Sequence, residues 1–163
     1  MGLVFLFSME GLTSIRSRFG PKETMDRLET EIRTQGMTVF ARIDHAAGAA
    51  GVELKLAPTE LIIFGNARGG TPLMQSAQTV GIDLPLKILV WENRAGKTWI
   101  SYNEPSWIAQ RHSVAKAEPI VSKMAAALNA MSKVAAGTRS RHRSLDRRNR
   151  APHSVLVGDE MRP

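Results

Sequence analysis

Residues 60–74 read ELIIFGNARGGTPLM, an apolar run that leads into a glycine-rich turn. The run at 61–64 predicts an interior strand, because a short, continuous apolar stretch is typical of one. Thr71 is suited to cap a helix and Pro72 to open it, so the pattern predicts a short helix from there to about Val80. A strand that ends in such a turn before a helix is a plausible place for a small molecule or an anion to bind.

The sequence before this segment predicts a strand, a helix and a second strand. Residues 12–17 alternate loosely and predict a strand, and residues 21–35 have the apolar spacing of an amphipathic helix. Residues 37–45 alternate with a period of two, which predicts a strand whose core-facing side includes His45. The small residues at 46–51 predict a flexible connection.

The sequence after this segment predicts a hairpin and two further helices. Residues 86–91 and 98–102 flank a short turn that contains glycine, which is typical of a β-hairpin. Pro105 opens a short helical turn, and residues 119–136 form an amphipathic helix that Gly137 ends. The order of elements predicts an α+β fold, with an antiparallel-rich sheet of four to five strands and helices packed on one face.

Length and charge predict one domain with two appendages. The chain has 163 residues, of which 43% are apolar, and this suits a single domain over residues 11–137. Residues 1–10 form an N-terminal extension. Residues 138–163 carry seven of the 22 Lys and Arg residues against three of the 15 Asp and Glu residues, so they supply more than half of the net charge of +7. Their arginine-rich part has no apolar periodicity, which predicts a disordered tail.

Composition excludes several classes of site. Cysteine is absent, so disulfides, thiolate metal sites and cysteine nucleophiles are excluded. The apolar residues 1–8 are too few to span a membrane and lack a basic segment before them, so we expect no signal peptide, no membrane span and a cytoplasmic protein. No motif points to a particular cofactor.

The glycine-rich turn is the first candidate site. Gly69 and Gly70 expose backbone amides, Arg68 adds a positive charge, and the helix that follows directs its positive end outward. The turn matches neither a Walker A loop nor the dinucleotide-binding fingerprint. The alternative interpretation is a plain tight turn with a helix cap.

His45 is the second candidate. An imidazole titrates near neutral pH, so His45, held by Asp44 or Glu60, is a candidate general acid or base. The alternative is a structural role at the end of the strand. The other three histidines lie far away in the sequence, so a metal site is not expected. No nucleophile motif accompanies His45.

Aromatic residues gather in the second half of the chain. Trp91 shares the face of its strand with Leu89, whereas Trp99 shares a face with Ser101. Packing in the core and in a dimer interface explains most of them, and the alternative is the wall of an apolar ligand pocket.

Four segments together resemble a known family. They are FARIDHAAGAA (40–50), PTELIIFGNARGGTPLMQ (58–75), GIDLPLKILVWE (81–92) and KTWISYNEP (97–105). They are similar to the bacterial domain of unknown function family 302 (DUF 302). The resemblance implies a small α+β domain of the TATA-binding-protein-like kind and a homodimer. It does not imply DNA binding, because a shared architecture does not carry function.

Three functions remain open. The first is a homodimeric module that binds a small molecule or an anion in a pocket between the sheet and the short helix. Its predicted ligand-binding residues are Asp44, His45, Asn66, Arg68, Gly69, Gly70, Thr71 and Tyr102. The second is an enzyme with His45 as acid or base and with the turn amides stabilising negative charge. The third is an adaptor whose arginine-rich tail binds nucleic acid or acidic partners.

Overall fold

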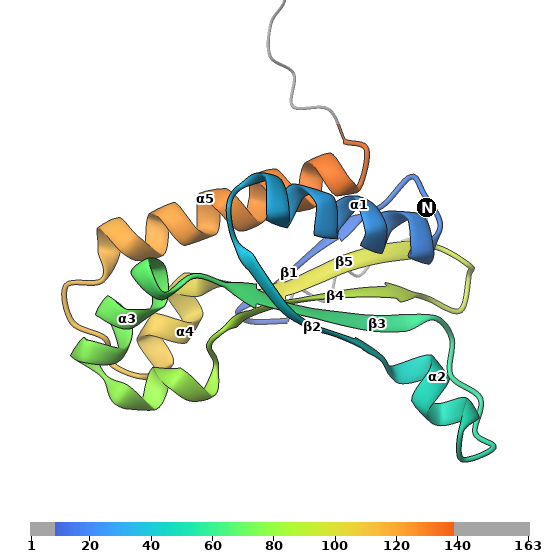
Figure 1. Ribbon diagram of the computed structural model, residues 1–163, viewed down its shortest axis with the longest axis horizontal. Coiled ribbons are helices and arrows are strands. Elements are labelled where there is room, and N and C mark those ends of the chain that lie inside the picture. Colours follow the sequence, from blue (N-terminus) through green and yellow to red (C-terminus); the bar gives the residue numbers. More distant parts are fainter. Residues whose placement is uncertain (1–8, 139–163) are drawn as a thin grey trace, which may run out of the picture.

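A computed structural model describes residues 9–138, so most of the predicted extension and nearly all of the predicted tail lie outside the described residues. Five strands form one antiparallel sheet in the order β1-β5-β4-β3-β2 (Figure 1). The strands are β1 (Leu12–Arg16), β2 (Thr38–Asp44), β3 (Thr59–Gly65), β4 (Leu86–Glu92) and β5 (Thr98–Asn103). The predicted hairpin is confirmed as β4 and β5, and the strand predicted at 61–64 lies inside the sheet, between β4 and β2.

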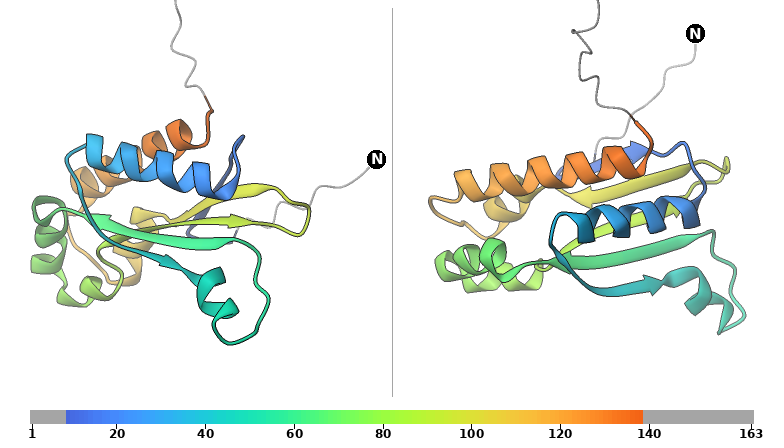
Figure 2. Two further views of the ribbon diagram at one scale, coloured as in Figure 1. Left: turned by 45° about the vertical axis from the view of Figure 1, so that its right-hand side comes forward. Right: turned by 45° about the horizontal axis from the view of Figure 1, so that its top comes forward.

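Two long helices cover one face of the sheet. Helices α1 (Pro21–Thr34) and α5 (Glu118–Ala135) lie side by side above the strands (Figures 1 and 2). Helix α3 (Ala67–Ser76), the 3-10 helix η1 (Gln78–Ile82) and α4 (Pro105–Arg111) gather at one end of the molecule, and α2 (His45–Ala50) projects from the other. The predicted α+β architecture, with the long helices on one face, is confirmed.

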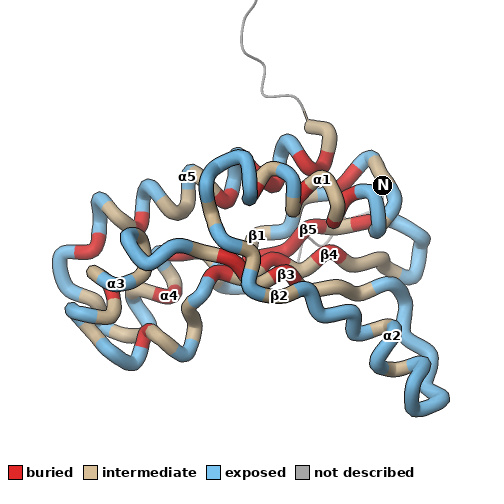
Figure 3. The backbone as a smooth tube through the Cα atoms, viewed as in Figure 1, coloured by how far each residue is buried: buried red, intermediate tan, exposed pale blue. Residues whose placement is uncertain are grey.

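The core lies between these two helices and the sheet (Figure 3). Phe64, Ile88 and Ile100 point from neighbouring strands toward the helices and are fully buried. Leu28 of α1 and Met131 of α5 close over them. Alternation along β3 and β4 directs every second side chain into this core, and the 3.6-residue period of each helix supplies the opposite wall.

A long arginine side chain joins the two covering helices. The Arg27 guanidinium of α1 donates hydrogen bonds to the carbonyl oxygens of Ala135 at 3.2 Å and Val134 at 3.1 Å. These carbonyls lie in the last turn of α5 and have no donor within the helix, although the Gly137 amide after it also donates to the Val134 carbonyl at 3.1 Å. A cation also suits the negative end of the helix dipole. The contact fixes the end of α5 against α1.

The predicted alternation of β2 is wrong beyond Val39. A β-bulge interrupts the pairing with β3 between Val39 and Ala41, and Phe40 is left exposed. One extra residue moves every later side chain to the other face. Arg42 therefore shares the helix-covered side with Ile62, its partner on β3.

Two helix predictions near the candidate sites also need correction. Residues 46–51 are mostly helical rather than a flexible connection, because the Asp44 carboxylate caps α2 by accepting a hydrogen bond from the Ala47 amide at 2.9 Å. Helix α3 begins at Ala67 rather than at Thr71, because Asn66 caps it. Asparagine is at least as good a cap as threonine, so the earlier residue begins the helix.

Candidate functional site

The corner at the start of α3 is formed by Asn66 and the first helical residues. The Asn66 side-chain oxygen accepts a hydrogen bond from the Gly69 amide at 2.7 Å, and its backbone carbonyl accepts one from the Gly70 amide at 3.2 Å. The two glycine amides are therefore engaged inside the helix. Within residues 9–138, no acceptor meets the backbone amides of Ala67 and Arg68, and the first turn contains no acidic residue.

Thr71 lies inside α3 rather than at its start. It borders a shallow depression along the helix, together with Met74, Gln75, Ser76 and Gln78. None of the residues that line this depression belongs to the strand or helix that carries Asp44 and His45. Thr71 is thus near the α3 corner but does not connect it to His45.

His45 lies at the opposite end of the sheet from this corner. Asp44 is opposite Glu60 in the β2–β3 register, whereas Thr38 is opposite Gly65, so the length of β3 separates the two places. At about 3.3 Å per residue, that separation is roughly 17 Å. His45 is exposed as the first residue of α2, and no carboxylate among the described residues forms a hydrogen bond with it. The expected hollow shared by His45 and the α3 corner is therefore not formed.

Tyr102 occupies a third place. It lies on β5 opposite Ile88, on the side of the sheet that the helices cover, and it is buried. Burial raises the pKa of the Tyr102 phenol, and the nearby charge of Glu104 raises it further. The eight predicted ligand-binding residues thus fall at the α3 corner (Asn66, Arg68, Gly69, Gly70, Thr71), at the start of α2 (Asp44, His45) and in the core (Tyr102).

The structure reveals a histidine cluster that the sequence did not indicate. His112 Nε2 lies 2.7 Å from a carboxylate oxygen of Asp83, and its Nδ1 lies 3.0 Å from the Thr79 hydroxyl. Arg111 also pairs with Asp83 at 3.2 Å. A carboxylate, an imidazole and a hydroxyl joined by hydrogen bonds can transfer a proton. The same contacts also hold η1 against α4. About thirty residues separate His112 from its partners, so no local pattern could have predicted the cluster.

Arg42 is the centre of an ionic cluster that joins α1 to the sheet edge. Its guanidinium lies 2.6 Å from Glu60 of β3, 2.9 Å from Glu29 and 3.0 Å from Asp26 of α1. Hydrogen bonds from Lys22 and then Arg42 lower the pKa of Asp26, and those from Arg33 and then Arg42 lower the pKa of Glu29. The pKa of Arg42 is raised, chiefly by Glu60.

Replacing Arg42 with methionine is expected to destabilise the fold in a pH-dependent way. Folding lowers the pKa of Asp26 and Glu29, so their stabilisation is present above the ordinary carboxyl pKa and is lost as pH falls through the folded values. The Arg42 side chain is 30% exposed, so solvent screening limits the loss to about 1–2 kcal/mol at pH 7. Urea unfolding at pH 7 and pH 3 measures it.

The matched control for this prediction is Arg94→Met. Arg94 is exposed in the β4–β5 turn, and no salt bridge is formed by it within the described part of the chain. We expect Arg94→Met to leave the free energy of unfolding nearly unchanged at both pH values. If Arg42→Met cost as much at pH 3 as at pH 7, the ionic explanation would be wrong.

The second face of the sheet, called the open face below, is covered by no helix among residues 9–138 (Figures 1 and 2). Cross-strand pairing places one set of side chains on it: Ser14, Arg16, Ala41, Ile43, Leu61, Ile63, Lys87, Leu89, Trp91, Trp99 and Ser101. Most of these side chains are apolar, and most are only partly buried. The open face is therefore an apolar band bordered by Arg16 and Lys87.

Two tryptophans organise the open face. The rings of Trp91 and Trp99 stack with centroids 6.3 Å apart and an angle of 23°. Trp91 Nε1 donates a hydrogen bond to the Ser101 hydroxyl at 2.9 Å, and Ser14 lies 2.8 Å from the same hydroxyl. Trp99 Nε1 is buried, and no described residue accepts its hydrogen bond. The predicted strand faces of Trp91 and Trp99 agree with the observed register.

Comparison with known proteins identifies the class of this domain. Residues 13–131 match the model of the family described as "Domain of unknown function DUF302", and the chain belongs to that family. A solved structure titled "uncharacterized conserved protein DUF302 from Bacillus stearothermophilus" superimposes with a TM-score of 0.71 at 19% identity, over 78% of this chain and 99% of that one. The family resemblance found in the sequence and the fold are thereby confirmed.

Curated relatives carry a different name. The fluoride-specific ion channel FluC 1 of Brucella suis biovar 1 (strain 1330) is 45% identical over 128 residues, which are 78% of this chain and 50% of that protein. The protein of the same name from Brucella abortus biovar 1 (strain 9-941) is also 45% identical, over 47% of its length. This chain spans about half the length of the curated relatives it matches. In residues 9–138, no helix is both long and apolar enough to cross a bilayer.

Proposed function

We propose that this chain is a homodimeric binding module and that two copies meet through the open face. The observation that carries the proposal is the apolar band, which runs over β2, β3, β4 and β5 on the side that no described helix covers. A sheet with an apolar face gains free energy when a second layer covers that face. In this fold, α1 and α5 cover only the opposite face.

The residue types on the open face support self-association. Tryptophan is enriched at protein interfaces because it buries a large apolar area while its indole N–H keeps a polar contact. Trp91 and Trp99 supply two such rings side by side, with Leu61 and Leu89 next to them. Such residues are typical of the centre of an interface, whereas Arg16 and Lys87 suit its rim.

Sedimentation equilibrium of the full chain tests this proposal. We expect the mass of a dimer at concentrations of about 1–100 µM. Dilution is expected to shift the fluorescence emission of Trp91 and Trp99 to longer wavelength as the open faces separate. A monomer mass throughout that range would contradict the proposal.

We propose, as a second function of the same module, that the α3 corner binds small anions. Two backbone amides at the start of α3 have no acceptor among the described residues, Arg68 adds a positive charge beside them, and the first turn contains no carboxylate. Fluoride, phosphate and carboxylates all accept hydrogen bonds from such groups. The name of the Brucella relatives makes fluoride the first anion to test.

Titration by NMR is expected to localise the anion. Fluoride or phosphate should move the amide signals of Ala67 and Arg68 in a saturable way, and Arg68→Gln should weaken binding about threefold to tenfold, because one exposed charge near a helix end contributes about 1 kcal/mol. Arg94→Gln is the matched control, since Arg94 is exposed in a turn away from α3. Small, non-saturating shifts over the whole chain would contradict an anion site here.

A further inference from the structure

The connection between β2 and β3, called the arm below, consists of residues 45–58. It contains α2 and the loop after it, and it projects beyond the end of the sheet (Figure 1). Figure 1 and the left view of Figure 2 show the arm below the sheet, on the side away from α1 and α5. The arm therefore projects on the side of the open face.

The arm holds apolar side chains out in solvent. Val52 and Leu54 are each 66% exposed and Leu56 is 50% exposed. The backbone around them is ordered by hydrogen bonds from the Gly51 amide to Ala47 O at 3.0 Å and from the Leu54 amide to Ala49 O at 2.9 Å. An ordered segment that exposes three apolar side chains close together in the sequence is suited to contact another apolar surface.

We infer that the arm of each protomer packs on the open face of a second copy of this chain, at the β1 edge of that copy. This inference rests on the proposed homodimer and adds to it the part that completes the interface. In a two-fold dimer, each contact occurs twice, so both arms and both open faces take part.

The order of the strands determines where the arm would arrive. A two-fold axis parallel to the strands, in front of the open face, places β2 of one copy over β1 of the other, because these strands are the two edges of the sheet. The same rotation places each end of the sheet in one copy next to the same end of the sheet in the other copy. Asp44 lies at the end of the sheet where Arg16 pairs with Trp99, so the arm meets the partner copy at Arg16.

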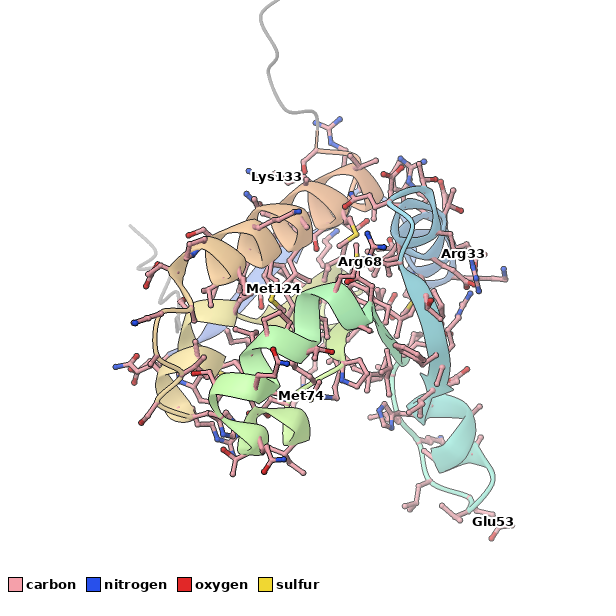
Figure 4. The ribbon with its side chains drawn as sticks, turned by 60° about the vertical axis from the view of Figure 1, so that its left-hand side comes forward. Arg33, Glu53, Arg68, Met74, Met124 and Lys133 are labelled. Atoms are coloured by element: carbon pink, nitrogen blue, oxygen red, sulfur yellow. The ribbon has the colours of Figure 1, made fainter. Side chains whose placement is uncertain are left out.

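Charge supports this arrangement. The tip of the arm carries Glu53, which Figure 4 labels at the extremity of the molecule. Arg16 of β1 is exposed at this end of the sheet. Lys55 follows Glu53, so the arm has no net charge, but the Glu53 carboxylate at its tip can pair with the Arg16 guanidinium of the partner copy.

Pairing through the free edge of β2 is the alternative dimer. The bulge at Phe40 interrupts the regular hydrogen-bonding pattern of that edge, and bulges of this kind discourage edge-to-edge pairing. Such a dimer would also leave the apolar residues of the open face in solvent. Packing through the open face buries these apolar residues, so we expect it rather than edge-to-edge pairing.

Sedimentation equilibrium with an arm variant tests the inference. Val52→Ser combined with Leu54→Ser removes four apolar side chains from a symmetric interface, so we expect the dissociation constant of the dimer to rise at least about 100-fold. The matched control is Ile82→Ser combined with Val134→Ser, which changes two exposed apolar residues away from the arm and should change the constant less than about threefold. If the wild type is a dimer and the arm variant is equally tight, the inference is overturned while the proposed homodimer stands. If the wild type is a monomer, both are overturned.

Crosslinking locates the contact independently, because the chain contains no cysteine of its own. Leu54→Cys and Arg16→Cys are placed on separately tagged chains, which are mixed and treated with a short bis-maleimide. We expect a mixed crosslinked dimer carrying both tags. Leu54→Cys mixed with Lys123→Cys, whose cysteine lies on α5, is the control and should give little product. Equal yields from the two mixtures would overturn the inference.

Discussion

Replacing Leu89 with glutamate is expected to convert the proposed dimer to a monomer without unfolding either copy. Leu89 lies on an inner strand of the open face, between Leu61 and Ser101. By symmetry, the change places two carboxylates in an apolar interface, where an unpaired charge costs several kcal/mol. A loss of about 4 kcal/mol raises the dissociation constant roughly a thousandfold, which sedimentation equilibrium detects directly.

The control for this prediction is Val134→Glu, which adds the same charge to an exposed apolar residue on α5. Val134 is 47% exposed and lies in the helical layer, away from the open face. Val134→Glu should leave the dimer intact. Far-UV circular dichroism must show the same helix content for both variants, so that a loss of the dimer is not caused by unfolding. A folded Leu89→Glu protein that is still a tight dimer would contradict the proposed interface.

Replacing Phe64 with alanine is expected to reduce the free energy of unfolding by about 3–5 kcal/mol. Phe64 is fully buried on β3 beneath the helices, so the change removes its apolar contacts and leaves a cavity that the neighbouring side chains fill only in part. Domains of this size are commonly stable by about 5–15 kcal/mol, so the variant would be close to unfolding. Urea unfolding at a fixed protein concentration measures the loss.

Phe40→Ala is the matched control, because it removes the same side chain from the neighbouring strand. Phe40 is 58% exposed at the bulge of β2. Its replacement should cost less than about 1 kcal/mol, as expected for an exposed position. Similar losses for the two variants would contradict the assignment of the core to the helix-covered side of the sheet.

Much of the fold could be predicted because its determinants are local. The alternation along β4 and β5 and the apolar stripe of α5 are properties of short segments, and the structure confirms those elements. The start of α3 was predicted incorrectly because two residues compete to cap it. Asn66 lies directly after the strand, and its cap leaves Thr71 in the middle of the helix.

The candidate site could be predicted only in part, because its geometry depends on pairing between strands. The corner at Asn66 and Arg68 is a local feature and was found in the sequence. Its distance from His45 is set by the β2–β3 register, which places the two at opposite ends of one strand pair. The pairing of His112 with Asp83 was not predicted, because the two residues come together only when α4 packs beside η1.

The sequence by itself determined the family, most of the helices and strands with their approximate limits, and the two faces of most strands. Hydrogen bonds between near neighbours and the fixed periods of helix and strand are sufficient for these features. Only the tertiary structure decided the strand order beyond the β4–β5 hairpin and which face of the sheet α1 and α5 leave open. It also decided where the bulge at Phe40 moves the later side chains of β2 to the other face. These features depend on contacts between residues far apart in the chain, and no local pattern specifies such contacts.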